Sequence, residues 1–209
     1  MEERERKLRR MKQSFRAARG LVRFGLGLMG LIAVFYLWYG GRVCMAPEEA
    51  FSVRETRYGE LWVDMEGSSI SAGNVTPSYA TPQARYGEIS GKRLQLVNMS
   101  LGAALVLAPI SWILFLLEGI FSGVISGGTP FVRGICRRLK AIGWTLVYFG
   151  AGAKILYLLG IYWLALEGQA RGMSYLFSFD ALFTGVLVLA LVKVFEYGSY
   201  LQDEYDTTL

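Results

Sequence analysis

The stretch GGTPFVRGICRRLKAIG, residues Gly127–Gly143, decides how the rest of the chain is arranged. It contains Arg133, Arg137, Arg138 and Lys140 and no acidic residue, and long apolar runs precede and follow it. A short basic loop between two membrane spans stays on the cytoplasmic side, because the excess of Lys and Arg sets the orientation. We therefore expect this stretch to be cytoplasmic, and the topology of the other segments follows from it.

The composition predicts a polytopic membrane protein without metal or cofactor chemistry. Of the 209 residues, 53% are hydrophobic and 19% are charged, against about 25% charged in an average globular protein. The absence of His removes imidazole metal ligands and the usual general base near neutral pH. The two cysteines, Cys44 and Cys136, are expected on opposite membrane faces and have no metal-ligand spacing. We expect no metal and no cofactor, and the net charge of +5 favours the lipid bilayer over nucleic acid as a partner.

The apolar runs predict an all-α polytopic membrane protein with four transmembrane helices, at residues 21–40, 99–121, 141–166 and 181–201. Each run provides the roughly 20 residues that a helix needs to cross a bilayer. The intervening segments are a basic cytoplasmic N-terminal tail (1–20), an extracytoplasmic segment (41–98), a basic cytoplasmic loop (122–140), a short external loop (167–180) and an acidic cytoplasmic tail (202–209). Both termini are therefore expected in the cytoplasm.

The extracytoplasmic segment is predicted to contain a small β element. Leu61, Val63 and Met65 recur at every second position, which is the period of a strand. The alternation over Arg93–Leu96 predicts a second strand, and Gly67–Gln83, rich in Ser, Gly, Thr and Pro, predicts a loop between them. Because so few residues bury little core alone, we expect this element to rest on the helix ends.

Two stretches in the second half of the chain carry a family pattern, at Pro130-Phe131, Arg138-Leu139, Ile142-Gly143, Phe195, Gly198, Leu201-Gln202, Glu204, Asp206 and Thr208. Through these residues the chain resembles the bacterial membrane protein family known as domain of unknown function 2975. The chain departs from the family pattern at Gly134-Ile135, Tyr205 and Thr207. The resemblance implies four spans in the bacterial cytoplasmic membrane, no known catalytic activity, and genes that often neighbour a small helix-turn-helix regulator.

Four ionisable residues inside the predicted spans are candidates for function: Glu118, Lys154, Lys193 and Glu196. A charge at the centre of a membrane helix costs on the order of 2.5–3.5 kcal/mol on insertion scales, so such residues are paired or functional. Lys193 and Glu196 are spaced i, i+3 on one helix face. The sequence leaves two interpretations open: interhelical ion pairs, or an inner-leaflet polar pocket for an anionic ligand, a lipid headgroup or a transported ion.

The sequence contains no catalytic constellation, since a chain without His has no Ser/His or Cys/His pair, and it has no Gly-rich phosphate loop. We expect a non-enzymatic regulator or sensor whose basic loop and acidic tail contact lipid or a cytoplasmic partner. The candidate contact residues are Arg133, Arg137, Arg138, Lys140, Asp203, Glu204 and Asp206. The alternative is a small transporter or channel subunit that uses the Lys/Glu cluster, which requires a homo-oligomer because four spans leave little room for a pore.

Overall fold

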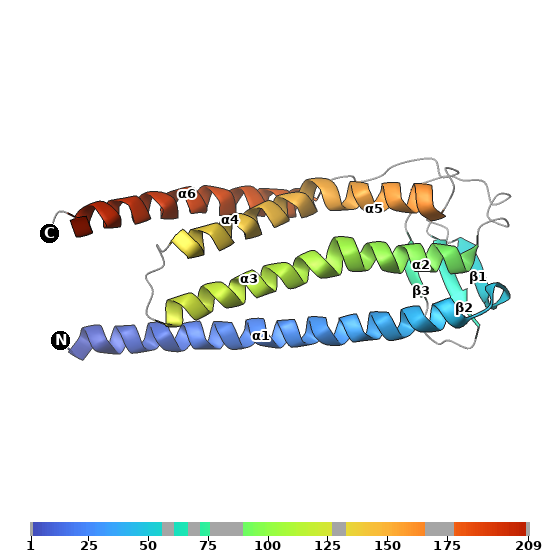
Figure 1. Cartoon of the computed structure of the whole chain (residues 1–209), viewed down its shortest axis with the longest axis horizontal. Helices are drawn as coiled ribbons and strands as arrows, with labels where there is room; N and C mark the ends of the chain where they lie inside the picture. Colours follow the sequence, from blue (N-terminus) through green and yellow to red (C-terminus); the bar gives the residue numbers. More distant parts are fainter. Residues whose placement is uncertain are drawn as a thin grey trace. The chain divides into compact units, whose positions relative to one another are not determined.

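The computed structural model describes residues 2–55, 61–66, 72–75, 90–126, 133–165 and 178–207, and most of them are helical (Figure 1). The α-helices are α1 (Glu2–Met45), α2 (Gly91–Gly102), α3 (Ala108–Ile125), α4 (Arg133–Tyr148), α5 (Lys154–Gly160) and α6 (Phe179–Thr207). Three π-helical segments, η3 (Ala103–Leu107), η4 (Phe149–Ala153) and η5 (Ile161–Ala165), continue α2, α4 and α5. A 3₁₀ turn, η1 (Glu48–Ala50), leads into strands β1 (Phe51–Glu55), β2 (Leu61–Met65) and β3 (Ala72–Val75).

Among the described residues, three helical stretches are long and apolar enough to cross a membrane: Gln13–Met45, Gly91–Ile125 and Gly134–Ala165. Each of the three exceeds the length that a bilayer requires. They contain the first two predicted spans and nearly all of the third, so the chain is a membrane protein. The fourth predicted span falls within α6, which continues to Thr207. Most of the predicted acidic tail is therefore part of this helix instead of a separate segment.

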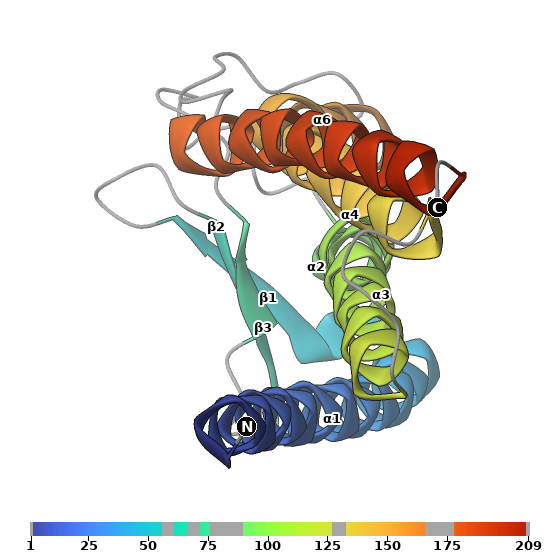
Figure 2. The same ribbon diagram turned by 90° about the vertical axis from the view of Figure 1, so that its left-hand side faces the viewer.

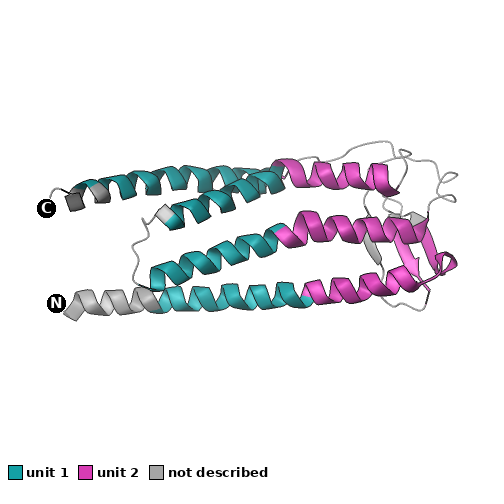
Figure 3. Ribbon diagram, viewed as in Figure 1, with its two compact units in different colours: residues 1–31, 109–150, 179–209 teal, residues 32–108, 151–178 magenta. Residues whose placement is uncertain are grey.

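The chain forms two compact units, coloured separately in Figure 3. Unit 1 comprises Met1–Leu31, Pro109–Gly150 and Phe179–Leu209, and unit 2 comprises Ile32–Ala108 and Ala151–Ser178. Helix α1 contributes residues to both units. Each unit has its own apolar core, and each is described by itself below.

In unit 2 the three strands form an antiparallel sheet of order β1-β2-β3 that contacts α2 (Figure 2). Val53 lies opposite Val63, and a bulge follows at Trp62/Val63 in the pairing of β2 with β3. The core of the unit combines side chains from α1, β2, α2 and η5: Tyr39, Val43, Val63, Met65, Leu94, Ile161 and Ala165. The strand predicted at Leu61–Met65 is thus confirmed, and it packs against helices as expected.

The second predicted strand, at Arg93–Leu96, is wrong, because these residues belong to α2. Ser90 is the N-cap of this helix, and its Oγ accepts a hydrogen bond from the Arg93 N–H at 3.2 Å. Gly91, Leu94 and Gln95 are buried, which is the i, i+3, i+4 spacing of a helix face. Four alternating residues were too short a pattern to distinguish a strand from the first turn of a membrane helix.

The predicted loop Gly67–Gln83 contains strand β3, so that part of the prediction is also wrong, and the remainder of this range lies outside the described residues. Most of the predicted external loop, together with Pro130 and Phe131 of the basic loop, likewise lies outside them. The basic loop itself is shorter than predicted, since α4 already begins at Arg133. All four of its cationic residues therefore lie on a helix.

In unit 1, α4 and α6 pack in antiparallel orientation at very short distance. A Cβ at Gly143 would lie 2.7 Å from Leu189 Cδ2, and one at Gly185 would lie 2.7 Å from Val147 N. A Cβ at Gly150 would overlap the backbone of Leu182. Small residues at these positions allow the two backbones to approach, as is common between membrane helices. A separate apolar cluster joins Leu116 and Ile120 of α3 to Ile135 and Ile142 of α4.

Candidate functional site

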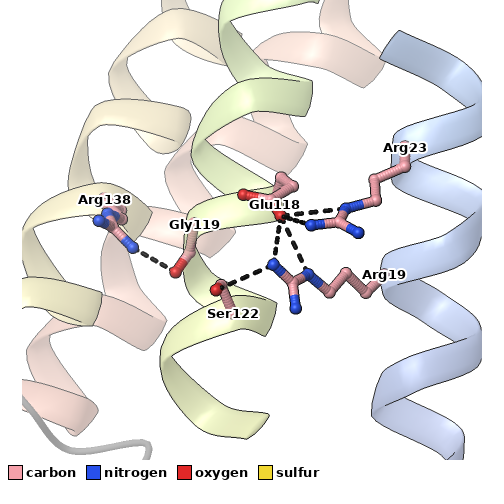
Figure 4. Close-up of polar contacts among 6 residues, drawn as sticks. All are labelled: Arg19, Arg23, Glu118, Gly119, Ser122 and Arg138. Atoms are coloured by element: carbon pink, nitrogen blue, oxygen red, sulfur yellow. Dashed lines mark hydrogen bonds and ion pairs between the residues drawn. The ribbon is translucent and has the colours of Figure 1, made fainter. Parts of the chain in front are cut away.

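Glu118, near the C-terminal end of α3, accepts hydrogen bonds from two arginines of α1 (Figure 4). Arg19 donates through Nε and Nη2 to Glu118 Oε1 at 2.9 and 2.8 Å, and Arg23 donates through the same atoms at 3.3 and 3.1 Å. Arg19 Nη2 also donates to Ser122 Oγ at 3.1 Å. Arg19 and Arg23 are one turn apart, as are Glu118 and Ser122, so the two pairs face each other in register.

Arg138 of α4 reaches α3 from a different direction and donates through Nη1 to the backbone oxygen of Gly119 (Figure 4). Gly119 is required for this approach, because a Cβ there would lie 2.6 Å from Nη1 and 2.8 Å from Cζ of Arg138. The α3 segment is therefore held by guanidinium groups from two other helices. We call Arg19, Arg23, Glu118, Ser122 and Arg138 the arginine–glutamate cluster.

A pocket of about 350 Å³ opens on α3 beside this cluster. Its lining residues are Phe115, Leu116, Glu118, Gly119, Ser122, Gly123, Ser126 and Arg138. Apart from Arg138 they come from α3 and from Ser126, the residue that follows it, and most of these are glycines or serines, whose small size creates the hollow. The lining is apolar at the Phe115 end and polar at the Ser126 end, so the pocket suits a molecule with both characters.

Of the four predicted intramembrane residues, Lys193 and Glu196 contact each other, and Glu118 contacts arginines. Lys193 Nζ and Glu196 Oε2 form the expected i, i+3 pair at 2.8 Å on α6, with Lys193 74% exposed. Glu196 also interacts electrostatically with Lys140 of α4. Lys154 is an exposed residue at the start of α5 and belongs to unit 2, whereas the other three belong to unit 1. Glu118 takes arginines as partners, which the sequence reasoning had not foreseen.

The predicted partner-contact residues lie on two neighbouring helices of unit 1. Arg137, Arg138 and Lys140 are exposed on the first turns of α4, which Arg133 begins. Glu204 is exposed near the end of α6, and Asp203 and Asp206 belong to the same helix. Among the described residues, no group of three or more Asp, Glu, Cys or His side chains is placed to hold a metal ion.

The residues that sequence reasoning missed are Arg19, Arg23 and Gly119. Arg19 and Arg23 occur in a run of basic residues, where nothing distinguishes them except their i, i+4 spacing. Glu118 and Ser122 have the same i, i+4 spacing. This match could indicate the contact between the two pairs once α1 and α3 are known to be neighbours.

The family described as "Protein of unknown function (DUF2975)" matches residues 72–209. The chain belongs to this family. The resemblance found in the second half of the sequence is thus confirmed, and the DUF2975 match includes Glu118, Gly119, Ser122 and Arg138. Arg19 and Arg23 lie outside the matched residues. No curated protein and no solved structure matches the chain.

Proposed function

We propose that this chain is a non-enzymatic regulator or sensor in the bacterial cytoplasmic membrane, with four spans and both termini in the cytoplasm. Helix α6 is the proposed fourth span. Its 29 residues give a length of roughly 44 Å at the helical rise, more than the hydrocarbon thickness of a bilayer. Lys193 and Glu196 are compatible with this placement, because paired charges are the usual kind found in membrane helices.

The observation that carries the proposal is the packing of α4 against α6. Since the two helices are antiparallel, with Gly143 opposite Gly185 and Leu189, the last turns of α6, which carry Glu204, continue past the basic first turns of α4 at the same end of unit 1. Arg137 and Lys140 are exposed on α4, and Glu204 is exposed on α6. One end of unit 1 therefore presents two surfaces of opposite charge.

Such a surface suits a folded protein partner better than a lipid surface alone. Complementary charge patterns fix the orientation of a partner and discriminate against wrong ones, whereas an anionic membrane selects for basic charge only. A small helix-turn-helix regulator, which the family resemblance implies as a genomic neighbour, is the proposed partner.

The secondary structure where the chain passes from one unit to the other supports a sensory role. The division after Gly150 falls within the π-helical segment η4, and the division after Ala108 comes one residue beyond η3. π-helical segments within α-helices are rare and are often found at functional sites. We propose that a condition perceived by unit 2, on the extracytoplasmic side, is passed along these helices.

Co-purification from native bacterial membranes tests the partner. The full chain is compared with a chain truncated after Tyr200 and with a Glu204→Lys variant, which keeps the helix intact. Arg93→Gln is the control, because it changes the charge of an exposed residue on α2, which belongs to unit 2. We expect a helix-turn-helix protein to be recovered with the full chain and the control, and to be lost from the other two. Equal recovery from all four chains would contradict the proposal.

The transporter alternative has weaker support. Glu118 pairs with two arginines, and Lys193 pairs with Glu196. Ion pairs of this kind keep charges in a membrane without any transported solute, so they do not by themselves favour a conducting path.

A further inference from the structure

We infer that the pocket on α3 is a phospholipid site, in which Arg138 binds the phosphate group and the Phe115 end accommodates the first part of an acyl chain. This inference does not depend on the proposed regulatory role. It uses only contacts within unit 1.

The charge around the pocket favours an anion. The arginine–glutamate cluster contains three arginines and one glutamate, which leaves a formal charge of +2. The carboxylate of Glu118 is already neutralised by Arg19 and Arg23. The C-terminal end of α3 opposes an anion with only about half a negative charge, so the arginines dominate.

Arg138 is suited to a phosphate because of how it is held. Its guanidinium group has five N–H donors in one plane, a geometry that matches phosphate oxygens. Among the described residues its one hydrogen bond is the contact of Nη1 with Gly119 O, which anchors the group at the pocket wall and leaves other donors for a ligand. Ser122, in the same lining, accepts a hydrogen bond from Arg19 and keeps its own hydroxyl hydrogen as a donor, whereas the Ser126 hydroxyl donates to Gly123 O.

The shape of the pocket favours an amphiphile over a free phosphate. Phe115, Gly119 and Ser122 follow one face of α3, which Ser126 continues, and the eleven steps from Phe115 to Ser126 rise about 16 Å at the helical rise. Phe115 is 60% exposed, so this apolar end is available to a hydrocarbon chain. Inorganic phosphate or glycerol phosphate shares the oxyanion chemistry but would use only the polar end.

Native mass spectrometry of the delipidated full chain in detergent tests the inference. The probes are phosphatidylglycerol, phosphatidylcholine, glycerol phosphate and inorganic phosphate, each added in increasing concentration. The variant Arg138→Gln removes the proposed phosphate ligand, and Arg137→Gln, an adjacent exposed arginine outside the lining, makes the same charge change as a matched control. We expect one phospholipid per chain, with affinity about tenfold weaker in Arg138→Gln, the loss of one charge-assisted contact, and unchanged in Arg137→Gln.

A second variant separates pocket filling from loss of charge. A Cβ at Gly123 would meet only Ile135 Cδ1, at 3.9 Å, so a side chain can begin there without a backbone clash, and Gly123→Leu is chosen to fill the hollow that Gly123 lines. Gly123→Leu should weaken phospholipid binding as strongly as Arg138→Gln does. If circular dichroism shows that Arg138→Gln does not fold, the binding measured for Gly123→Leu tests the inference in its place.

Two results would overturn the inference. Equal weakening in Arg137→Gln and Arg138→Gln would mean that lipid is attracted by the general basic surface. Displacement of the lipid by glycerol phosphate or inorganic phosphate, at concentrations comparable to that of the lipid, would assign the pocket to a soluble phosphate compound. Neither result affects the co-purification test of the cytoplasmic partner, so failure of one proposal is distinguishable from failure of the other.

Discussion

Two arginines converge on a single carboxylate oxygen, Oε1 of Glu118, although they differ in exposure. The side chains of Arg19 and Glu118 are 26% and 22% exposed, whereas that of Arg23 is 60% exposed. Ion pairs between solvent-exposed residues contribute little to stability, because water and salt screen them. Arg19 has the shorter and less exposed contacts and a second partner in Ser122, so of the two arginines it makes the stronger connection between α1 and α3.

We predict that Glu118→Gln lowers the melting temperature of the detergent-solubilised protein by a few degrees. The variant removes the anion between two cations that are one turn apart, so it leaves like charges facing each other. Melting curves of Glu118→Gln, Arg19→Gln and the double variant form a thermodynamic cycle, in which we expect clear non-additivity.

Arg16→Gln is the control for this cycle, because Arg16 is an exposed arginine one turn before Arg19 on α1. Its effect should simply add to that of Glu118→Gln. If the effects of Arg19→Gln and Glu118→Gln were also additive, the pair would have no role in joining the two helices.

The sequence could identify Glu118 but not its partners. A glutamate in an apolar run must be paired or functional, which is a rule about one residue and its immediate surroundings. Its partners depend on which helices are neighbours, and helix order is a property of the whole chain. The lysines were expected as partners because they lie well inside the spans, whereas Arg23 lies at the start of the first span and Arg19 was attributed to the N-terminal tail.

At the scale of whole elements, the contact between α4 and α6 depends on glycine. We predict that Gly185→Ala destabilises the protein by about 1–3 kcal/mol, the usual cost of overpacking. The added methyl group would lie 2.7 Å from Val147 N and 3.0 Å from Gly143 O, both of which are backbone atoms that cannot rotate away. The measurement is the loss of folded protein with temperature, monitored by size-exclusion chromatography in detergent.

Gly27→Ala is the matched control, since a Cβ at Gly27 of α1 would have nothing within 4 Å. There the higher helix propensity of Ala should leave stability unchanged or raise it by up to about 1 kcal/mol. A Gly185→Ala protein as stable as the Gly27→Ala protein would show that the two helices do not need their close contact.

The sequence predicted elements well where a pattern was long and poorly where it was short. The apolar runs placed the spans, because about 20 apolar residues have few alternative explanations. In unit 2 the strand at Leu61–Met65 was correct, but Arg93–Leu96 was assigned to a strand although it forms the first turns of α2. Strand β3 had no visible signal, since Ala72–Val75 contains glycine and asparagine, which are depleted in strands.

At the scale of the whole molecule, no residue pattern indicates that the long helices are shared between two units. The divisions after Leu31, Ala108 and Gly150 fall inside continuous apolar runs. Hydropathy measures whether a helix can enter a membrane, and it does not depend on which helices then pack together. Two of these divisions lie at or next to π-helical segments, which no residue pattern in the apolar runs indicates.

The proposed topology predicts which positions a membrane-impermeant maleimide can reach in intact spheroplasts. Cys44 is exposed and serves as the native reporter for the extracytoplasmic side, but Cys136 is only 6% exposed and is a poor reporter for the cytoplasm. In a background with Cys44→Ser and Cys136→Ala, single cysteines are therefore introduced at the exposed positions Gly134, Ser178 and Glu204.

We expect labelling of native Cys44 and of Ser178→Cys in intact spheroplasts, whereas Gly134→Cys and Glu204→Cys should react only after lysis. Ser178 and Glu204 lie near the two ends of α6, so this pair tests the fourth span directly. If both react from the same side, α6 does not cross the membrane. Labelling of Gly134→Cys before lysis would instead invert the orientation, because the basic first turns of α4 would then face the outside, against the bias that Lys and Arg impose on short loops.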